Sequence, residues 1–263
     1  MIQGYVSVLL TSARQQWVYR SELVARAVQM VLFMAVFMAL WFTAFEVSGQ
    51  SQLEGYSLAE MVWYLAMTET IVLSSSRIFL EIGEAVRAGD LAYTLARPLS
   101  YPFFQVANSL GNSAPRVLLN LLTGAGVVTV GLQQVAGSWP GLVAFLFVAA
   151  LALLLDALIA VLIGLTAFWI EEVSPVYWIY NKLLFTVGGL FLPLELFPEQ
   201  LQRAVRWLPF QYITYAPART FVKFEAGFVA ETVAGQAAYI GFFAGLVLLV
   251  WARAQRRLVV HGG

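Results

Sequence analysis

Long apolar runs dominate the chain, and each of them is bounded by polar or charged residues. A helix that crosses a lipid bilayer needs about 20 mostly apolar residues. Glu60 and Glu69 interrupt one of the runs, Lys182 lies in another, and the run 141–170 is long for a single span. Even so, the pattern predicts an all-α, polytopic membrane protein. Its six transmembrane helices are expected at about residues 27–45, 57–75, 116–135, 141–170, 176–194 and 237–251.

Two segments outside these runs are amphipathic, and both are expected at the membrane surface. Residues 5–26 mix apolar side chains with Arg and Gln, which is typical of a helix that lies in the interface. Residues 197–224 are expected to form short re-entrant helices on the outer side, because prolines break their apolar runs. Pro198 suits the first position of a helix, Pro209 is expected to end it, and a second short helix is expected after Pro217.

Residues 77–98 are a third amphipathic segment, between the second and third predicted spans. Gly89 is expected to end its helix in the left-handed conformation, and Asp90 is expected to cap a short helix that follows. Such a helix either lies on lipid or docks onto a cytoplasmic partner, and the pattern leaves both open. The charged residues at helical spacing on one face are Arg77, Glu81, Glu84 and Arg87.

Composition excludes several classes of protein. Hydrophobic residues make up 60% of the 263 positions and charged residues 11%, against about 45–50% and about 25% in soluble domains. Fifteen basic residues balance fifteen acidic ones, so nothing indicates a nucleic-acid partner. There is no cysteine and the single histidine is His261, so we expect no metal site and no catalytic residue. A G-x-x-x-x-G-K-[ST] motif is also absent, which argues against ATP hydrolysis by this chain.

The distribution of arginine predicts the orientation of the protein. Arginines cluster in 14–26, 77–97 and 253–257, and basic residues favour the cytoplasmic side of short loops. We therefore expect one multi-pass domain, 1–263, in the cell (plasma or inner) membrane with both termini in the cytoplasm. Four basic residues in 197–224, on the predicted outer side, run against this rule.

Two carboxyl groups lie inside predicted spans. Ionisable groups in membrane segments are costly and often functional. Glu69 lies in the second predicted span and Asp156 near the middle of the fourth. Either residue could face a substrate path, or form a hydrogen bond that fixes helix packing, and the sequence leaves both interpretations open.

Several stretches, in their order along the chain, resemble those of a known family. The stretch from Gly89 to Pro98 reads GDLAYTLARP, and residues 191–198 read FLPLELFP. The second stretch continues through Leu-Pro-Phe at 208–210 to Tyr-Ala-Pro-Ala-Arg at 215–219. With six spans in this arrangement, the whole chain resembles the permeases of type-2 ABC exporters, the branch known as ABC-2 family transporter proteins.

This resemblance implies a function and partners. Residues 5–26 would be the connecting helix, and 197–224, with Pro198 and Pro209, the outer gate. Two permease chains, identical or related, would work over two separate ABC ATPase subunits, which bind ATP and Mg, and would export an amphiphilic substrate by alternating access. A membrane scaffold protein or a secondary transporter are the alternatives. The residues that would contact the ATPase through the coupling helix at 77–90 are Glu81, Glu84, Arg87, Gly89 and Asp90.

Cysteine labelling tests the predicted orientation against the clean background of a cysteine-free chain. A membrane-impermeant maleimide added to intact cells should label cysteines placed at Gln50 and Ser138. It should not label cysteines at Asp90 and Val260 until the membrane is permeabilised, because the arginine clusters hold these positions inside. Labelling of position 90 in intact cells would overturn the orientation.

Overall fold

A computed structural model describes residues 2–18, 20–89 and 98–261. Within these ranges the chain is built from α-helices and short 3-10 turns, and contains no β-strand beyond a single bridge between Leu53 and Tyr56. The 3-10 turns are η1 (Thr166–Phe168), η2 (Leu194–Leu196) and η3 (Pro209–Tyr212). The α-helices are α1 (Ile2–Gln16), α2 (Arg20–Ser48), α3 (Leu58–Val72), α4 (Ile78–Ala88), α6 (Tyr101–Leu132), α7 (Trp139–Leu165), α8 (Ser174–Val187), α9 (Glu199–Val205), α10 (Tyr215–Val222) and α11 (Ala226–His261).

Four helices are long and apolar enough to cross a membrane: Ser21–Ser48, Tyr101–Leu132, Trp139–Phe168 and Ala226–Arg256. They correspond to the first, third, fourth and sixth predicted spans. The helices at the second and fifth, α3 and α8, have 15 and 14 residues. At a rise of about 1.5 Å per residue they cover only about 21–23 Å of a hydrocarbon core about 30 Å thick. The count of six spans therefore stays a prediction.

The short helix α3 runs through the centre of the bundle. Every residue from Met61 to Ile71 is buried, so other helices rather than lipid surround it. Irregular backbone is tolerated at membrane depth when protein covers it. The turn after α8 illustrates this, because its carbonyl groups at Gly189 and Leu190 accept hydrogen bonds from Tyr64 and Thr68 of α3.

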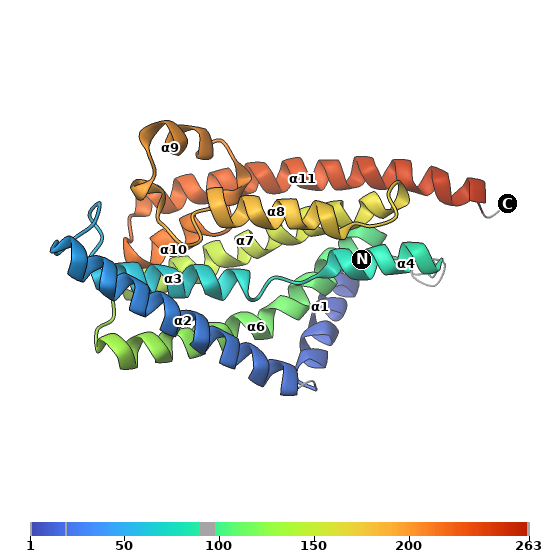
Figure 1. Ribbon diagram of the computed structural model, residues 1–263. Coiled ribbons are helices and arrows are strands. Elements are labelled where there is room, and N and C mark those ends of the chain that lie inside the picture. Colours follow the sequence, from blue (N-terminus) through green and yellow to red (C-terminus); the bar gives the residue numbers. More distant parts are fainter. Residues whose placement is uncertain (1, 19, 90–97, 262–263) are drawn as a thin grey trace.

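The N-terminal segment differs from the prediction. Residues 5–26 are not one interfacial helix: α1 ends at Gln16, and α2 begins at Arg20 and continues as the first long apolar helix. α1 crosses the bundle obliquely and packs on α6 (Figure 1). The amphipathic pattern of 20–26 belongs to the polar first turns of a spanning helix, because Glu22 and Arg26 pair there.

The helix at the third predicted span begins well before residue 116, at Tyr101, and includes Pro115. Proline has no backbone N–H, so it cannot donate to the carbonyl group of Gly111. The predicted start at about residue 116 was therefore wrong, because the helix begins at Tyr101. Packing of α6 against α1, α2 and α3 holds the helix together through this point.

The outer segment contains short helices as predicted, with different starting points. Pro198 is the residue before α9 rather than its first residue, and Pro209 begins η3 rather than ending a helix. Pro217 lies inside the first turns of α10, where the first backbone N–H groups of a helix have no intrahelical partner. The expected end of α4 is confirmed, because Gly89 follows the helix with a φ of 73°.

The two ends of the bundle carry different elements. α4 and the C-terminal end of α11 lie at one end, whereas α9, α10 and the loop 49–57 lie at the other (Figure 1). The polar loops that the prediction assigned to opposite sides of the membrane thus lie at opposite ends of the molecule.

The crossing of α1 over α6 depends on a glycine. A Cβ atom at Gly111 would lie 2.4 Å from the carbonyl oxygen of Leu9 and 2.7 Å from Cβ of Ser12. We expect Gly111→Ala to push α1 away and to destabilise the protein by about 1–3 kcal/mol, lowering its midpoint of thermal unfolding in detergent. Gly126→Ala is the matched control on the same helix, because nothing lies within 4 Å of its added Cβ. Equal unfolding midpoints for the two variants would contradict the close crossing.

Candidate functional site

A row of polar side chains follows one face of α6. Asn108, Asn112, Arg116 and Asn120 are spaced four residues apart, so they lie one above another along the helix. The last three are buried, with exposed fractions of 8%, 8% and 0%. Buried polar groups must find partners or cost about 1–3 kcal/mol each. We call these four residues the α6 polar row.

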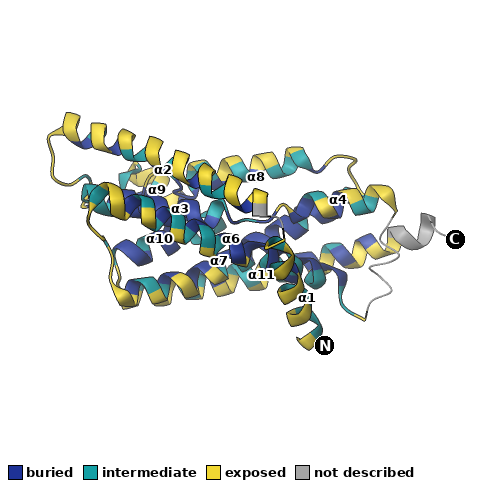
Figure 2. Cartoon of the chain, turned by 90° about the horizontal axis from the view of Figure 1, so that it is seen from below, coloured by how far each residue is buried: buried dark blue, intermediate teal, exposed yellow. Residues whose placement is uncertain are grey.

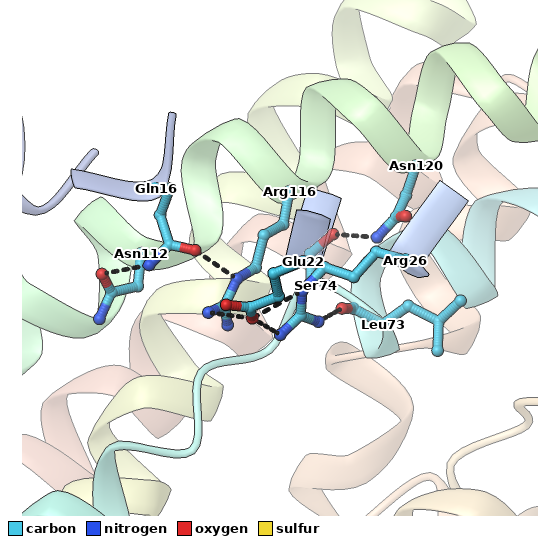
Figure 3. Close-up of polar contacts among 8 residues, drawn as sticks. All are labelled: Gln16, Glu22, Arg26, Leu73, Ser74, Asn112, Arg116 and Asn120. Atoms are coloured by element: carbon cyan, nitrogen blue, oxygen red, sulfur yellow. Dashed lines mark hydrogen bonds and ion pairs between the residues drawn. The ribbon is translucent and has the colours of Figure 1, made fainter. Parts of the chain in front are cut away.

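The centre of the row is an ion-pair cluster between α6 and α2 (Figure 3). Oε1 of Glu22 lies 2.7 Å from a guanidinium nitrogen of Arg26 and 3.5 Å from one of Arg116. Nε of Arg116 also donates to Gln16 of α1, whose side-chain amide donates to Asn112. One carboxylate thus lies between two guanidinium groups, and the cluster keeps one positive charge in excess.

The two ends of the row reach other helices. Asn120 donates to Ser74, just beyond α3, at 3.0 Å, and Arg26 donates to the carbonyl oxygen of Leu73 beside it. At the other end Asn108 donates to Oε2 of Glu81 on α4 and accepts from Ser12 of α1. The α6 polar row therefore connects α1, α2, the end of α3 and α4.

α4 packs closely on α7 and leaves a charged face outward. A Cβ atom at Gly164 would lie 2.9 Å from Cβ of Ile82, so the two helices approach closely. Arg87 forms an exposed ion pair with Glu172 at 3.3 Å. Hydrogen bonds from Ser174 lower the pKa of Glu172 and so favour the charged carboxylate that faces Arg87.

The predicted coupling residues thus have different environments. Burial raises the pKa of Glu81, and its hydrogen bond from Asn108 acts in the opposite direction. Glu84 is exposed and has no ion-pair or hydrogen-bond partner among the described residues. Gly89 forms the C-cap of α4, and Asp90 lies outside the described residues.

A cleft of about 420 Å³ opens between α2, α3, α4 and α8. Its charged lining residues are Arg26, Glu69, Arg77 and Lys182. Glu69 is 2% exposed, and its Oε1 has no hydrogen-bond partner within the described part of the chain. Of the two carboxyl groups singled out in the sequence, Glu69 is therefore the one that lies at a cleft.

Asp156 has a different environment. It is 4% exposed, and its Oδ1 accepts a hydrogen bond of 2.5 Å from the hydroxyl group of Tyr180. This contact joins α7 to α8, and Asp156 is not among the residues that line the cleft. A role for Asp156 in a substrate path stays a prediction.

Most of the basic residues that run against the expected orientation have partners at the end of the bundle that carries α9 and α10. Arg219 lies between Glu195 and Glu225, at 3.2 and 3.1 Å, and Arg203 pairs with Glu199. Nζ of Lys223 lies 3.5 Å from the ring centroid of Tyr56 and donates to a backbone carbonyl. Acidic and aromatic neighbours balance these charges locally.

The α6 polar row was missed in the sequence. Its signal is the recurrence of Asn, Asn, Arg and Asn every four residues across Pro115. Because the prediction placed the start of a span after this proline, the row was divided between a loop and a helix. The partners on α1, α2 and α4 lie far along the chain and could not be found by spacing alone.

The long apolar helices and the packed amphipathic helices define a multi-pass membrane protein. Residues 20–262 match the profile of a family described as ABC-2 family transporter protein. The chain therefore belongs to this family and is a permease of the ABC-2 type, the membrane component of an ABC transporter. A search of curated proteins finds no match.

Removing the carboxylate between the two guanidinium groups tests the ion-pair cluster. Glu22→Gln leaves Arg26 and Arg116 facing each other without a counter-charge. Since Glu22 is half-exposed, we expect a modest loss of stability, about 1–2 kcal/mol, seen as a lower midpoint of thermal unfolding. Glu46→Gln is the control, because Glu46 is exposed on the same helix. If the two variants unfold alike, the cluster contributes nothing measurable.

Proposed function

We propose that this permease forms the membrane path of an ATP-driven exporter and that α4 is its coupling helix. A separate ATPase subunit binds ATP and Mg and docks on α4. The observation that carries this proposal concerns the two faces of α4. Its outward Glu84 has no partner among the described residues, and its inward face packs closely on the transmembrane helices. A helix that only rests on lipid needs no such fixed inner face.

The contacts of α4 suit the transmission of its movement to the transmembrane helices. Its close approach to α7 at Ile82 and Gly164 leaves little room for independent motion. The hydrogen bond between Glu81 and Asn108 ties it to the α6 polar row. A displacement of α4 by ATP-driven closure of the ATPases then moves α6, and with it α1, so that the path alternates between the two sides.

The remainder of the assembly follows from the same proposal. Two permease chains, identical or related, sit over two ATPase subunits in the cell membrane, each permease with six spans and both termini in the cytoplasm. α2 presents an apolar stripe at four-residue spacing, which suits a second permease or lipid. The exposed members of this stripe are Val24, Val28, Leu32, Val36 and Leu40.

The outer segment suits a gate. Pro198 and Pro209 set where α9 and η3 begin, and fixed proline φ angles keep these turns in place. Arg219 holds α10 to η2 through Glu195 and to the region before α11 through Glu225. The segment can then move as one unit at the outer end of the path, through which an amphiphilic substrate leaves.

Charge reversal on the outward face of α4 tests the coupling assignment. Glu84→Lys should leave membrane insertion and yield intact, because this side chain has no partner within the described residues. It should lower co-purification of the ATPase by at least about tenfold, since a docked charge pair is lost and a like-charge contact is created. Export should fall in parallel.

Glu46→Lys makes the same change on an exposed position of α2 and should leave both readouts unchanged. A Glu84→Lys protein that binds its ATPase and exports at the parental rate would show that α4 is an interfacial anchor only.

A further inference from the structure

The cleft between α2, α3, α4 and α8 has an unbalanced charge. Three basic residues and one acidic residue line it. Arg26 is already paired with Glu22. Arg77 and Lys182 form no ion pair with any described residue. The lining therefore holds two basic side chains without an ion pair among the described residues, against the single carboxyl group of Glu69.

The two basic residues come from different elements, and aromatic side chains line the same cleft. Arg77 precedes α4, and Lys182 is on α8 next to Trp178, with its Nζ 5.8 Å from the centroid of the indole ring. Figure 2 shows α2 and α8 on the same side of the bundle, with exposed residues along both. The large apolar side chains that line the cleft from these helices and the turn after α8 are Phe33, Trp178, Phe185 and Phe191.

Hydrogen-bonding groups complete the polar part. Gln29, Ser75, Ser174 and Asn181 also line the cleft. A second cleft of about 420 Å³ shares Arg26, Gln29 and Arg77, and adds Arg116 together with the acidic residues Glu22 and Glu81. The two clefts share three polar residues, and the first cleft also has aromatic lining residues.

We propose that this cleft binds an amphiphile with an anionic headgroup, held by Arg77 and Lys182, while its apolar part packs on the aromatic side chains of α2 and α8. Charge-assisted hydrogen bonds from guanidinium and ammonium groups are the contacts that such a headgroup needs. A cationic headgroup would instead add positive charge beside Arg26, Arg77 and Lys182. The inference deepens the proposed transport function by naming a class of substrate.

Binding to the purified full-length chain in phosphatidylcholine nanodiscs tests the proposal without ATPase or transport, so its failure and that of the coupling assignment are distinguishable. The probe is radiolabelled phosphatidic acid with eight-carbon chains. Arg77→Gln combined with Lys182→Gln should weaken its binding at least about tenfold, because both charge-assisted contacts are lost. Arg77→Lys with Lys182→Arg keeps both charges and should retain most of the affinity.

Arg203→Gln combined with Arg253→Gln is the matched control, since it removes two exposed positive charges that do not line the cleft. It should not weaken binding. Unchanged binding by the Arg77/Lys182 variant, or equal weakening by the control, would overturn the proposal.

The Glu69→Gln variant tests whether the cleft prefers an anionic or a cationic ligand. It removes the acidic lining residue and should leave binding of the phosphatidic acid unchanged or up to a few fold tighter. Dodecyltrimethylammonium is the cationic probe, and it should bind more weakly than the anionic one. Tighter binding of this cation, abolished by Glu69→Gln, would overturn the proposal.

Two further arms identify the source of the headgroup. Inorganic phosphate should compete poorly, because it lacks the apolar part. Displacement of the probe by long-chain phosphatidylglycerol in the nanodisc would support a membrane lipid as the natural occupant. If this lipid does not displace the probe, the result would support a soluble amphiphile of the same charge.

Discussion

The hydrogen bonding of a polar row inside an apolar bundle is the constraint on which this structure depends. Buried polar side chains are costly without partners, and those of α6 find most of theirs on other helices. Arg116 meets Glu22 and Gln16, and Asn120 meets Ser74. The positions of α1, α2 and the end of α3 around α6 follow from satisfying these groups.

The same row ties the proposed coupling helix to the membrane part. α4 is attached twice: through a hydrogen bond from Asn108 to Glu81, and through the contact of Ile82 with Gly164 of α7. Apolar packing alone would hold α4 in place without specifying its direction. The added polar contact fixes its orientation relative to α6, because hydrogen bonds are directional. In the proposed mechanism, a movement imposed on α4 would reach both helices.

The segment around α10 and the cleft between α2, α3, α4 and α8 differ in how their charges are balanced. At the end that carries α9 and α10, Arg219 lies between two carboxylates and Lys223 lies against the ring of Tyr56. In the cleft between α2, α3, α4 and α8, Arg77 and Lys182 form no ion pair with a described residue. Local neutralisation stabilises the segment around α10, whereas basic side chains without an ion pair, in a cleft with aromatic lining residues, suit the proposed anionic amphiphile.

Sequence alone determined the class of protein. Apolar composition and the length of apolar runs are properties of the chain itself, and they decide whether a helix can span a bilayer. It also determined where α4 ends, since Gly89 adopts a conformation that glycine favours. Only the tertiary structure decided that α6 continues through Pro115 and that α1 is separate from α2. Only the tertiary structure showed that Glu69 lies at a cleft. Contacts between helices that are distant along the chain produce no periodic pattern in the sequence.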